Sequence, residues 1–202
     1  SAIAEVLTGA VAPSGRLPVS LPRTVGQLPV HHSSRAGGDR SQFWGDYTDS
    51  PTTTLHPFGF GLTTTTFGYD ELFVAEGSTT EPTTISVRLT NTGSRTASEV
   101  VQLYVGDLVA SVARPDRQLV GFTRVELAPG ERATVSFELH PSRLAFHDED
   151  FDLVCEPGAF RAELCGCAGQ PAVTTTFDLT GDVAPHPVKD LVATVATVTT
   201  VA

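Results

Sequence analysis

Hydrophobic and polar residues alternate in a series of short segments between residues 67 and 182. This period of two predicts β-strands, because successive side chains of a strand point to opposite faces of a sheet. The expected strands lie at 72–74, 85–89, 101–105, 119–127, 135–139, 153–155, 160–164 and 173–179. Turn triplets such as Asn91-Thr92-Gly93 and Ala128-Pro129-Gly130 close several of them. About eight strands at this spacing predict an antiparallel β-sandwich of immunoglobulin-like size.

The first 66 residues follow a different pattern and are rich in proline, glycine and serine. Apolar residues at helical spacing over residues 1–7 predict a short helix there. Residues 17–21 alternate and predict a short strand, which Pro18 and Pro22 restrict to a sheet edge or an irregular extended path.

The segment that joins these two patterns is Pro57-Phe58-Gly59-Phe60-Gly61. The glycines permit backbone angles that a β-carbon forbids, and the proline fixes one dihedral angle. The aromatic side chains can then enter a core while another backbone approaches the glycines. We therefore predict a rigid corner at a domain junction.

A long irregular stretch, residues 31–54, precedes this corner and contains Phe43, Trp44, Asp46 and Tyr47. Loops of this length in compact domains are often functional. Its aromatic residues have two interpretations: a lip that contacts a sugar, or an anchor that fixes the loop on a neighbouring domain.

The net charge, the length of apolar runs and the cysteine content restrict the classes of partner. A net charge of −10 argues against nucleic acid, whose binding proteins usually show a basic patch. No apolar run approaches the ~20 residues that span a membrane. Cys155, Cys165 and Cys167 do not form a disulfide framework or a metal-site spacing, so we expect small core or surface residues and no metal or cofactor. Unpaired cysteines favour a reducing compartment such as the cytoplasm. No other feature of the sequence determines the compartment.

The chain contains no methionine at all, and its first residues do not resemble a signal peptide. We therefore expect Ser1 to be internal to a longer protein. For the tail, residues 183–202, the sequence leaves two possibilities, a loose strand and disorder.

Motifs that occur in one order give the chain a family resemblance. Two of them are Pro13-Ser14-Gly15-Arg16-Leu17-Pro18-Val19-Ser20 and the corner at 57–62. The others lie at 2–9, 25–30, 87–93, 99–105, 118–122 and 127–131. Together they resemble the C-terminal portion of family 3 glycoside hydrolases, of the β-glucosidase and β-xylosidase type.

The resemblance implies a domain order of barrel, α/β sandwich and fibronectin type III-like sandwich. It assigns residues 1–66 to the end of the α/β domain plus its linker, and residues 67–182 to the fibronectin type III-like module. The fold class expected is therefore mainly β, an immunoglobulin-like antiparallel sandwich preceded by the tail of an α/β domain. The implied partners are the missing barrel and α/β domains and, in the full enzyme, a β-linked glucoside or xyloside.

The resemblance also implies a retaining mechanism with two carboxylates. The nucleophilic aspartate belongs to the barrel and the acid/base glutamate to the upstream part of the α/β domain, so no catalytic residue transfers to this chain. The densest acidic cluster, Asp148 to Asp152, is expected to be a solvated loop. We predict an inactive fragment that supports its catalytic domains. The alternatives are a stand-alone carbohydrate-binding or adhesion module and a small active glycosidase.

Overall fold

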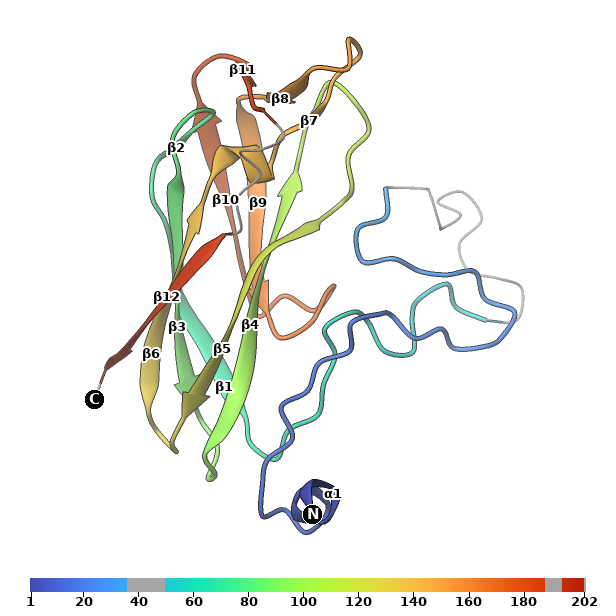
Figure 1. Cartoon of the computed structure of the whole chain (residues 1–202), viewed down its shortest axis with the longest axis vertical. Coiled ribbons are helices and arrows are strands. Elements are labelled where there is room, and N and C mark those ends of the chain that lie inside the picture. The colour runs from blue at the N-terminus through green and yellow to red at the C-terminus, as the bar shows by residue number, and fades with distance from the viewer. Residues whose placement is uncertain (36–49, 188–193, 202) are drawn as a thin grey trace.

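The computed structural model describes residues 1–35, 50–187 and 194–201. It shows an elongated two-layer β-sandwich with an irregular segment along one side (Figure 1). We call this segment, residues 8–35 and 50–66, the arm. The expected fold class, a mainly β immunoglobulin-like sandwich, is confirmed.

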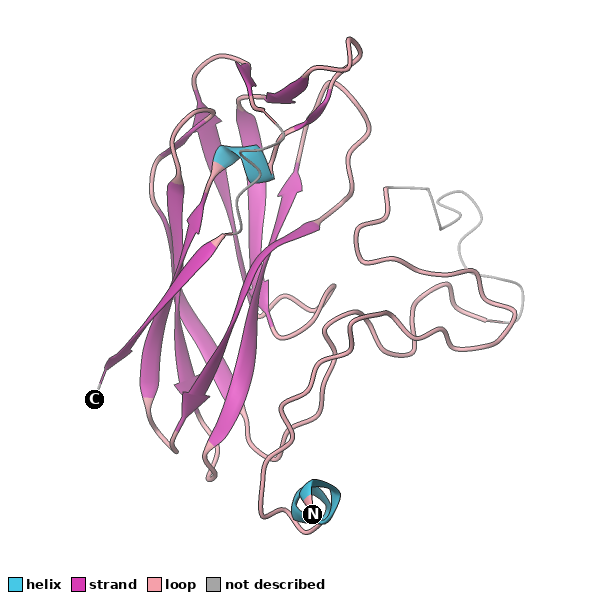
Figure 2. Ribbon diagram, in the orientation of Figure 1, coloured by secondary structure: helices cyan, strands magenta, loops and turns pink. Residues whose placement is uncertain are grey.

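The described elements begin with one short helix, continue almost entirely as strands and include a single 3-10 turn (Figure 2). Their bounds are α1 (Ala2–Leu7), β1 (Phe67–Val74), β2 (Gly77–Ser78), β3 (Thr83–Asn91), β4 (Ala97–Asp107), β5 (Gln118–Leu127), β6 (Arg132–Leu139), η1 (Pro141–Arg143), β7 (Phe146–His147), β8 (Leu153–Cys155), β9 (Gly158–Cys165), β10 (Val173–Thr180), β11 (Ala184–Pro185) and β12 (Val195–Val201).

Two sheets form the layers of the sandwich. The first has the strand order β1-β3-β6-β12, and the second has the order β2-β10-β9-β4-β5. All pairings in them are antiparallel except that of β2 with β10. A small third sheet, β11-β8-β7, lies at the end of the sandwich farthest from α1 (Figure 1).

The core lies between the two sheets and is built by the alternation seen in the sequence. On the first sheet Ile85 pairs with Phe137, and on the second Leu103 pairs with Leu164. All four side chains are fully buried. Burying apolar surface at about 25 cal/mol per Å² is the main stabilising term of such a layer.

The tail contributes a strand. Residues 195–201 form β12, which pairs with residues 132–138 of β6 and forms one edge of the first sheet. Of the two possibilities left open by the sequence, the strand is therefore the one that these residues adopt.

The arm differs from the expectation of a strand at residues 17–21. Only Leu21 makes a β-bridge, with His56, and the rest of the segment is irregular. Pro18 and Pro22 lack the N–H that a ladder needs, which limits the pairing to isolated hydrogen bonds. The short helix expected at the N-terminus is present as α1, and none of its residues is buried. Along the described part of the chain, no helix is long and apolar enough to cross a lipid bilayer.

Candidate functional site at the junction of arm and sandwich

The predicted corner is a tight turn. The Phe60 N–H donates to the Pro57 carbonyl at 3.1 Å, and Gly59 has φ +79°. A positive φ at the third position of a turn is the feature that type II turns require and that glycine supplies without steric cost. The N-terminal segment of the arm, residues 8–35, holds this turn in place. The Gly59 N–H donates to the Leu17 carbonyl, and the Leu17 N–H donates to the Phe60 carbonyl.

Gly59 also lies directly against strand β4. A β-carbon at this position would come within 2.3 Å of the Gln102 side-chain oxygen. Gln102 is itself buried, donates to the Gly166 carbonyl and accepts a 2.6 Å hydrogen bond from the Tyr104 hydroxyl. The corner is therefore fixed by close backbone approach to a satisfied polar network on the outer face of the second sheet.

Phe58 provides the apolar part of the same contact. It packs against a small cluster of buried residues on the outer face of the second sheet, including Tyr104, Cys165 and Ala168. The Phe58 carbonyl accepts from the Ala168 N–H at 2.9 Å, and the ring stacks on His32 with centroids 4.1 Å apart. Strand β4 is thus buried on both faces, by the core on one side and by the arm on the other.

An ion pair between Arg16 of the arm and Glu99 of β4 joins the two parts of the chain. The Arg16 Nη2 and Glu99 Oε1 atoms are 2.5 Å apart, and the side chains are 16% and 6% exposed. Arg16 also donates to the Gly61 carbonyl at 3.2 Å. Gly61 and Gly166 leave the room for this pair, since a β-carbon at either position would lie within 3 Å of Arg16 or Glu99.

Burial dominates the electrostatics of this pair. Removal from water raises the pKa of Glu99, although Arg16 acts in the opposite direction. Burial together with the neighbouring Glu99 raises the pKa of Tyr69 well above its usual value. Both groups therefore favour their neutral forms more than they would in water.

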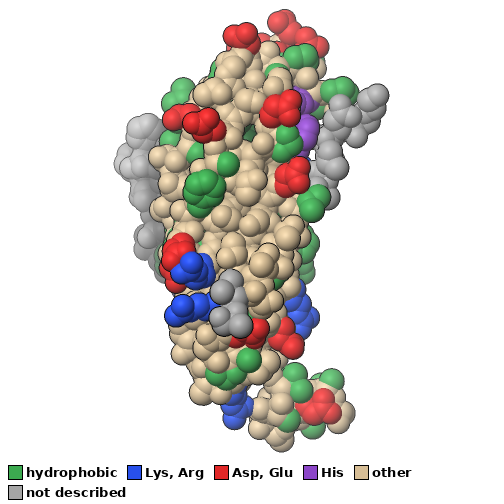
Figure 3. All heavy atoms as spheres, turned by 90° about the vertical axis from the view of Figure 1, so that its left-hand side faces the viewer, with side chains coloured by type: hydrophobic (Ala, Val, Ile, Leu, Met, Phe, Trp, Pro, Cys, Tyr) green, Lys and Arg blue, Asp and Glu red, His purple; other side chains and the backbone are tan. Residues whose placement is uncertain are grey.

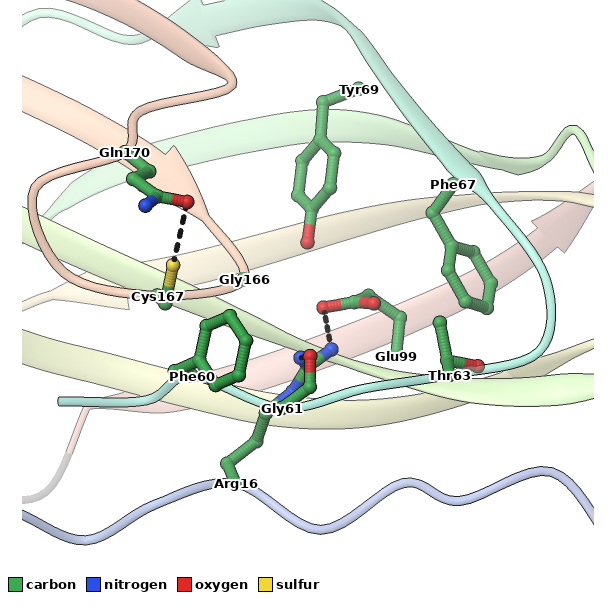
Figure 4. Close-up of a pocket in the computed structure, with 10 residues that line it drawn as sticks. All are labelled: Arg16, Phe60, Gly61, Thr63, Phe67, Tyr69, Glu99, Gly166, Cys167 and Gln170. Atoms are coloured by element: carbon green, nitrogen blue, oxygen red, sulfur yellow. Dashed lines mark hydrogen bonds and ion pairs between the residues drawn. The ribbon is translucent and has the colours of Figure 1, made fainter. Parts of the chain in front are cut away.

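A pocket of about 250 Å³ opens beside the ion pair. Arg16, Phe60, Gly61 and Thr63 of the arm line one side, and Phe67, Tyr69, Glu99, Gly166, Cys167 and Gln170 of the sandwich line the other. Figure 4 shows Tyr69 pointing toward Glu99, which meets Arg16 from the opposite wall. The pocket is thus shared by the arm and the sandwich.

Comparisons with known proteins match this division of the chain. The glycosyl hydrolase family 3 C-terminal domain matches residues 1–64, and the fibronectin type III-like domain matches residues 99–165. The chain belongs to glycosyl hydrolase family 3 and corresponds to a C-terminal region of its members. Its relatives include a periplasmic β-glucosidase of Salmonella typhimurium, 40% identical over 168 residues, and a β-xylosidase of Formosa agariphila, 46% identical over 167 residues. Each alignment covers 79% of this chain and 22% of the relative.

Solved structures give the same result at the level of the fold. The β-glucosidase from Listeria innocua in complex with glucose superposes with a TM-score of 0.83 at 30% identity. The match covers 90% of this chain and 26% of that chain. This family 3 region therefore spans about a quarter of the length of the enzymes that it resembles.

Of the two predicted groups of site residues, one lies at the junction and the other lies outside the described residues. Pro57, Phe58, Gly59, Phe60 and Gly61 come together with strand β4 at the junction, as described above. The substrate-loop candidates Phe43, Trp44, Asp46 and Tyr47 lie outside the described residues.

The acidic cluster forms a loop beyond β7. The Asp148 carboxylate accepts the backbone N–H groups of Asp150 and Asp152, so it closes the loop on itself. The three cysteines are unpaired and buried, and burial raises the pKa of both Cys155 and Cys165 to about 12. Such thiols stay protonated near neutral pH and behave as small core residues. Among the described residues, no group of three or more histidine, cysteine or acidic side chains could hold a metal ion.

Sequence reasoning missed the Arg16–Glu99 pair and the network around Gln102. Arg16 and Glu99 are separated by 83 positions, so no local spacing relates them. A signal was nevertheless present in the family motifs at 13–20 and 99–105, since each of them contains one member of the pair.

Proposed function

We propose that this chain is the C-terminal part of a retaining, exo-acting β-glycosidase that hydrolyses β-linked glucosides or xylosides, and that it supports the catalytic domains. Residues 1–66 complete the α/β domain and its linker. Residues 67–182 form the fibronectin type III-like module, to which residues 195–201 of the tail add strand β12. The β-glucosidase and β-xylosidase names of the aligned relatives support this substrate class.

One observation carries the proposal: the arm and α1 expose large apolar side chains, while the backbone of the arm is held on the sandwich. Ile3 is 74% exposed, Leu7 is 81% exposed and Val25 is fully exposed. The others of this set are Val6, Val11, Val19, Leu21, Leu28, Leu55 and Leu62. Exposed apolar surface of this extent marks an interaction site. A domain that precedes the arm, as in relatives about four times as long, would cover it.

The described residues of the sandwich also expose apolar side chains, from several separate strands and loops. On the face drawn in Figure 3, hydrophobic side chains are scattered over the strands, whereas α1 projects at the lower end with hydrophobic side chains on its surface. Scattered apolar residues on a protein surface are ordinary. The apolar side chains of the N-terminal segment are the ones that we propose a preceding domain covers.

The buried carboxylates of the described residues are arranged for structure. Glu99 is paired with Arg16, Asp107 with Arg114 at 3.5 Å, and Glu163 with Arg117 and Arg161. A retaining glycosidase needs two carboxyl groups about 5–5.5 Å apart that face the sugar. These ion pairs hold each carboxylate against a guanidinium group instead, which supports the proposal that catalysis belongs to the preceding domains.

Hydrolysis of an aryl β-glucoside and an aryl β-xyloside by the purified chain tests the proposal. We expect no turnover above the buffer control, because the nucleophile and the acid/base residue are supplied by other domains. Turnover that persists after a second purification, and that is lost in an Asp107→Asn or Glu99→Gln variant, would show that the chain has its own active site and would overturn the proposal.

The alternative of a stand-alone carbohydrate-binding module gains no support from the exposed phenylalanines of the described residues. Three phenylalanines are strongly exposed: Phe73 on β1, Phe122 on β5 and Phe151 in the acidic loop. Since β1 and β5 are edge strands of different sheets, these rings do not form one aromatic strip.

A further inference from the structure

We propose that the pocket between arm and sandwich binds a small neutral polyhydroxylated molecule, a single sugar ring or a glycerol-sized polyol. The inference concerns a site within this chain and does not depend on the presence of catalytic domains. It rests on three features of the pocket: unpartnered polar atoms, internal charge balance and aromatic walls.

Two buried polar atoms of the pocket lack a hydrogen-bond partner. They are the Arg16 Nε and the Thr63 Oγ1, whereas the nearby Tyr69 hydroxyl interacts with the Glu99 carboxylate. Arg16, Thr63 and Tyr69 line the same pocket, two from the arm and one from β1. Buried polar groups in native proteins nearly always have a partner, because an unsatisfied group costs about 1–3 kcal/mol. A ligand with several hydroxyl groups can satisfy donors and acceptors of this kind together.

The charges of the pocket select a neutral ligand. Arg16 and Glu99 neutralise each other at 2.5 Å, and both side chains are largely buried. An anion or a cation would have to break this pair and leave the other member without a counter-charge, which is strongly unfavourable in a buried site. Hydroxyl groups can bond to both members without breaking the pair.

The walls and the size limit the ligand further. Phe60 and Phe67 add apolar aromatic surface to the polar groups, and Figure 4 shows both rings beside the ion pair. Pockets for drug-sized ligands measure about 300–1,000 Å³, so a pocket of about 250 Å³ suits a smaller molecule. A sugar ring combines apolar C–H faces with hydroxyl edges and fits this mixture.

Titration of the isotope-labelled chain with D-xylose, D-glucose and glycerol, followed by amide NMR, tests the proposal. We expect saturable shifts confined to amides of the pocket, such as Gly61, Gly166 and Cys167, with a dissociation constant on the order of 1 mM for at least one of them. Sulfate and acetate, titrated in the same way, should produce no saturable shift at these amides.

Two conservative variants separate binding from folding. Thr63→Val removes an unpartnered hydroxyl, and Tyr69→Phe removes the hydroxyl that interacts with Glu99; both retain the shape of the side chain. We expect Thr63→Val to leave the melting temperature unchanged or higher, and the affinity to fall by about threefold to tenfold in each variant, the net value of one hydrogen bond. Thr64→Val, at the neighbouring exposed position, is the matched control and should leave the affinity unchanged.

Several results would overturn the proposal. These are the absence of saturable pocket shifts with all three probes, shifts that survive both variants, or tighter binding of sulfate or acetate. Protection of the Leu17 amide from exchange reports that the arm is docked, because this N–H donates to Phe60. A Leu17 amide that exchanges as in a free peptide would mean that one wall of the pocket is missing, and would also overturn the proposal.

Discussion

At the scale of single residues, Gly59 determines whether the arm can dock on the sandwich. It combines φ +79° with an approach to Gln102 that leaves no space for a β-carbon. Glycine at this position therefore serves both the turn and the contact, and each requirement excludes other residues independently.

Replacement of Gly59 by alanine should weaken the docked arm by about 2–4 kcal/mol, through backbone strain and overpacking against Gln102. Amide exchange at Leu17 and Ala168 measures the effect, since both N–H groups bond to the corner. Gly15→Ala is the matched control: a β-carbon there meets nothing within 4 Å, so its effect should stay within about 0.5 kcal/mol. Equal effects of the two variants would refute this role for Gly59.

The Arg16–Glu99 pair gives a second prediction. Arg16→Met leaves a buried carboxylate without its partner and should cost about 3 kcal/mol of arm docking at neutral pH. Glu99→Leu alone should also be harmful, whereas the Arg16→Met/Glu99→Leu double variant should be less affected than either single variant. Exchange at the Leu17 amide measures all three, and strict additivity would contradict an interaction between the two side chains.

The pH dependence of the Arg16→Met defect follows from the direction of the Glu99 shift. Burial raises the pKa of Glu99 in the docked state, and loss of Arg16 raises it further. The docked state then binds a proton more tightly than the undocked state, so docking weakens as the pH rises from the ordinary glutamate pKa through the raised value. The defect should therefore be largest at neutral pH and shrink in acid.

Residue roles were predictable from the sequence only where they are local. The corner at 57–61 could be recognised because proline, glycine and aromatic residues determine a turn by themselves. The contacts of Arg16 and Gln102 depend on which distant segments meet, and composition does not contain that information. Tyr104 shows the same limit, because strand alternation placed Gln102 and Tyr104 on the outer face of β4 without revealing that the arm would bury them.

At the scale of elements, the arm and the sandwich differ in how they are held. Strands β3, β4, β6 and β9 are paired on both sides and surround the core. Among the described residues, the arm is held by a few backbone hydrogen bonds, side-chain hydrogen bonds from Arg95, Gln102 and Arg124, one ion pair and the Phe58 contact. Many of its apolar side chains are exposed.

Hydrogen exchange of the chain should therefore resolve two levels of protection. We expect strong protection across residues 85–165 and much faster exchange in residues 1–35 and 50–66, because local opening costs little where few buried contacts exist. The Leu17 and Gly59 amides should still exchange more slowly than in a free peptide. Uniform protection along the described chain would contradict the separation between arm and sandwich.

Element prediction succeeded where the period of two is sustained. Strands such as β3 and β6 bury alternate residues almost perfectly, so their pattern identifies both the strand and its inner face. Residues 17–21 adopt the irregular path that Pro18 and Pro22 allowed and not an edge strand, because alternation alone does not supply the N–H groups that prolines remove. The valine- and threonine-rich tail lacked a decisive signal, and its pairing with β6 is a tertiary effect.

At the scale of the whole molecule, the arm has one face on the sandwich and another that is exposed. The chain spans about a quarter of the length of its family 3 relatives and covers their C-terminal region. An arm with two such faces is what a linker between a catalytic domain and its supporting module requires. The support that we propose would act through Phe58, Gly59 and the Arg16–Glu99 pair.

The coding sequence immediately upstream of the Ser1 codon tests this account most directly. We predict a continuous open reading frame that encodes a barrel domain and the first part of an α/β domain, which together supply the nucleophilic aspartate and the acid/base glutamate. A stop codon in frame shortly before Ser1, followed by a start codon, would show that no catalytic domain precedes the arm and would contradict the account.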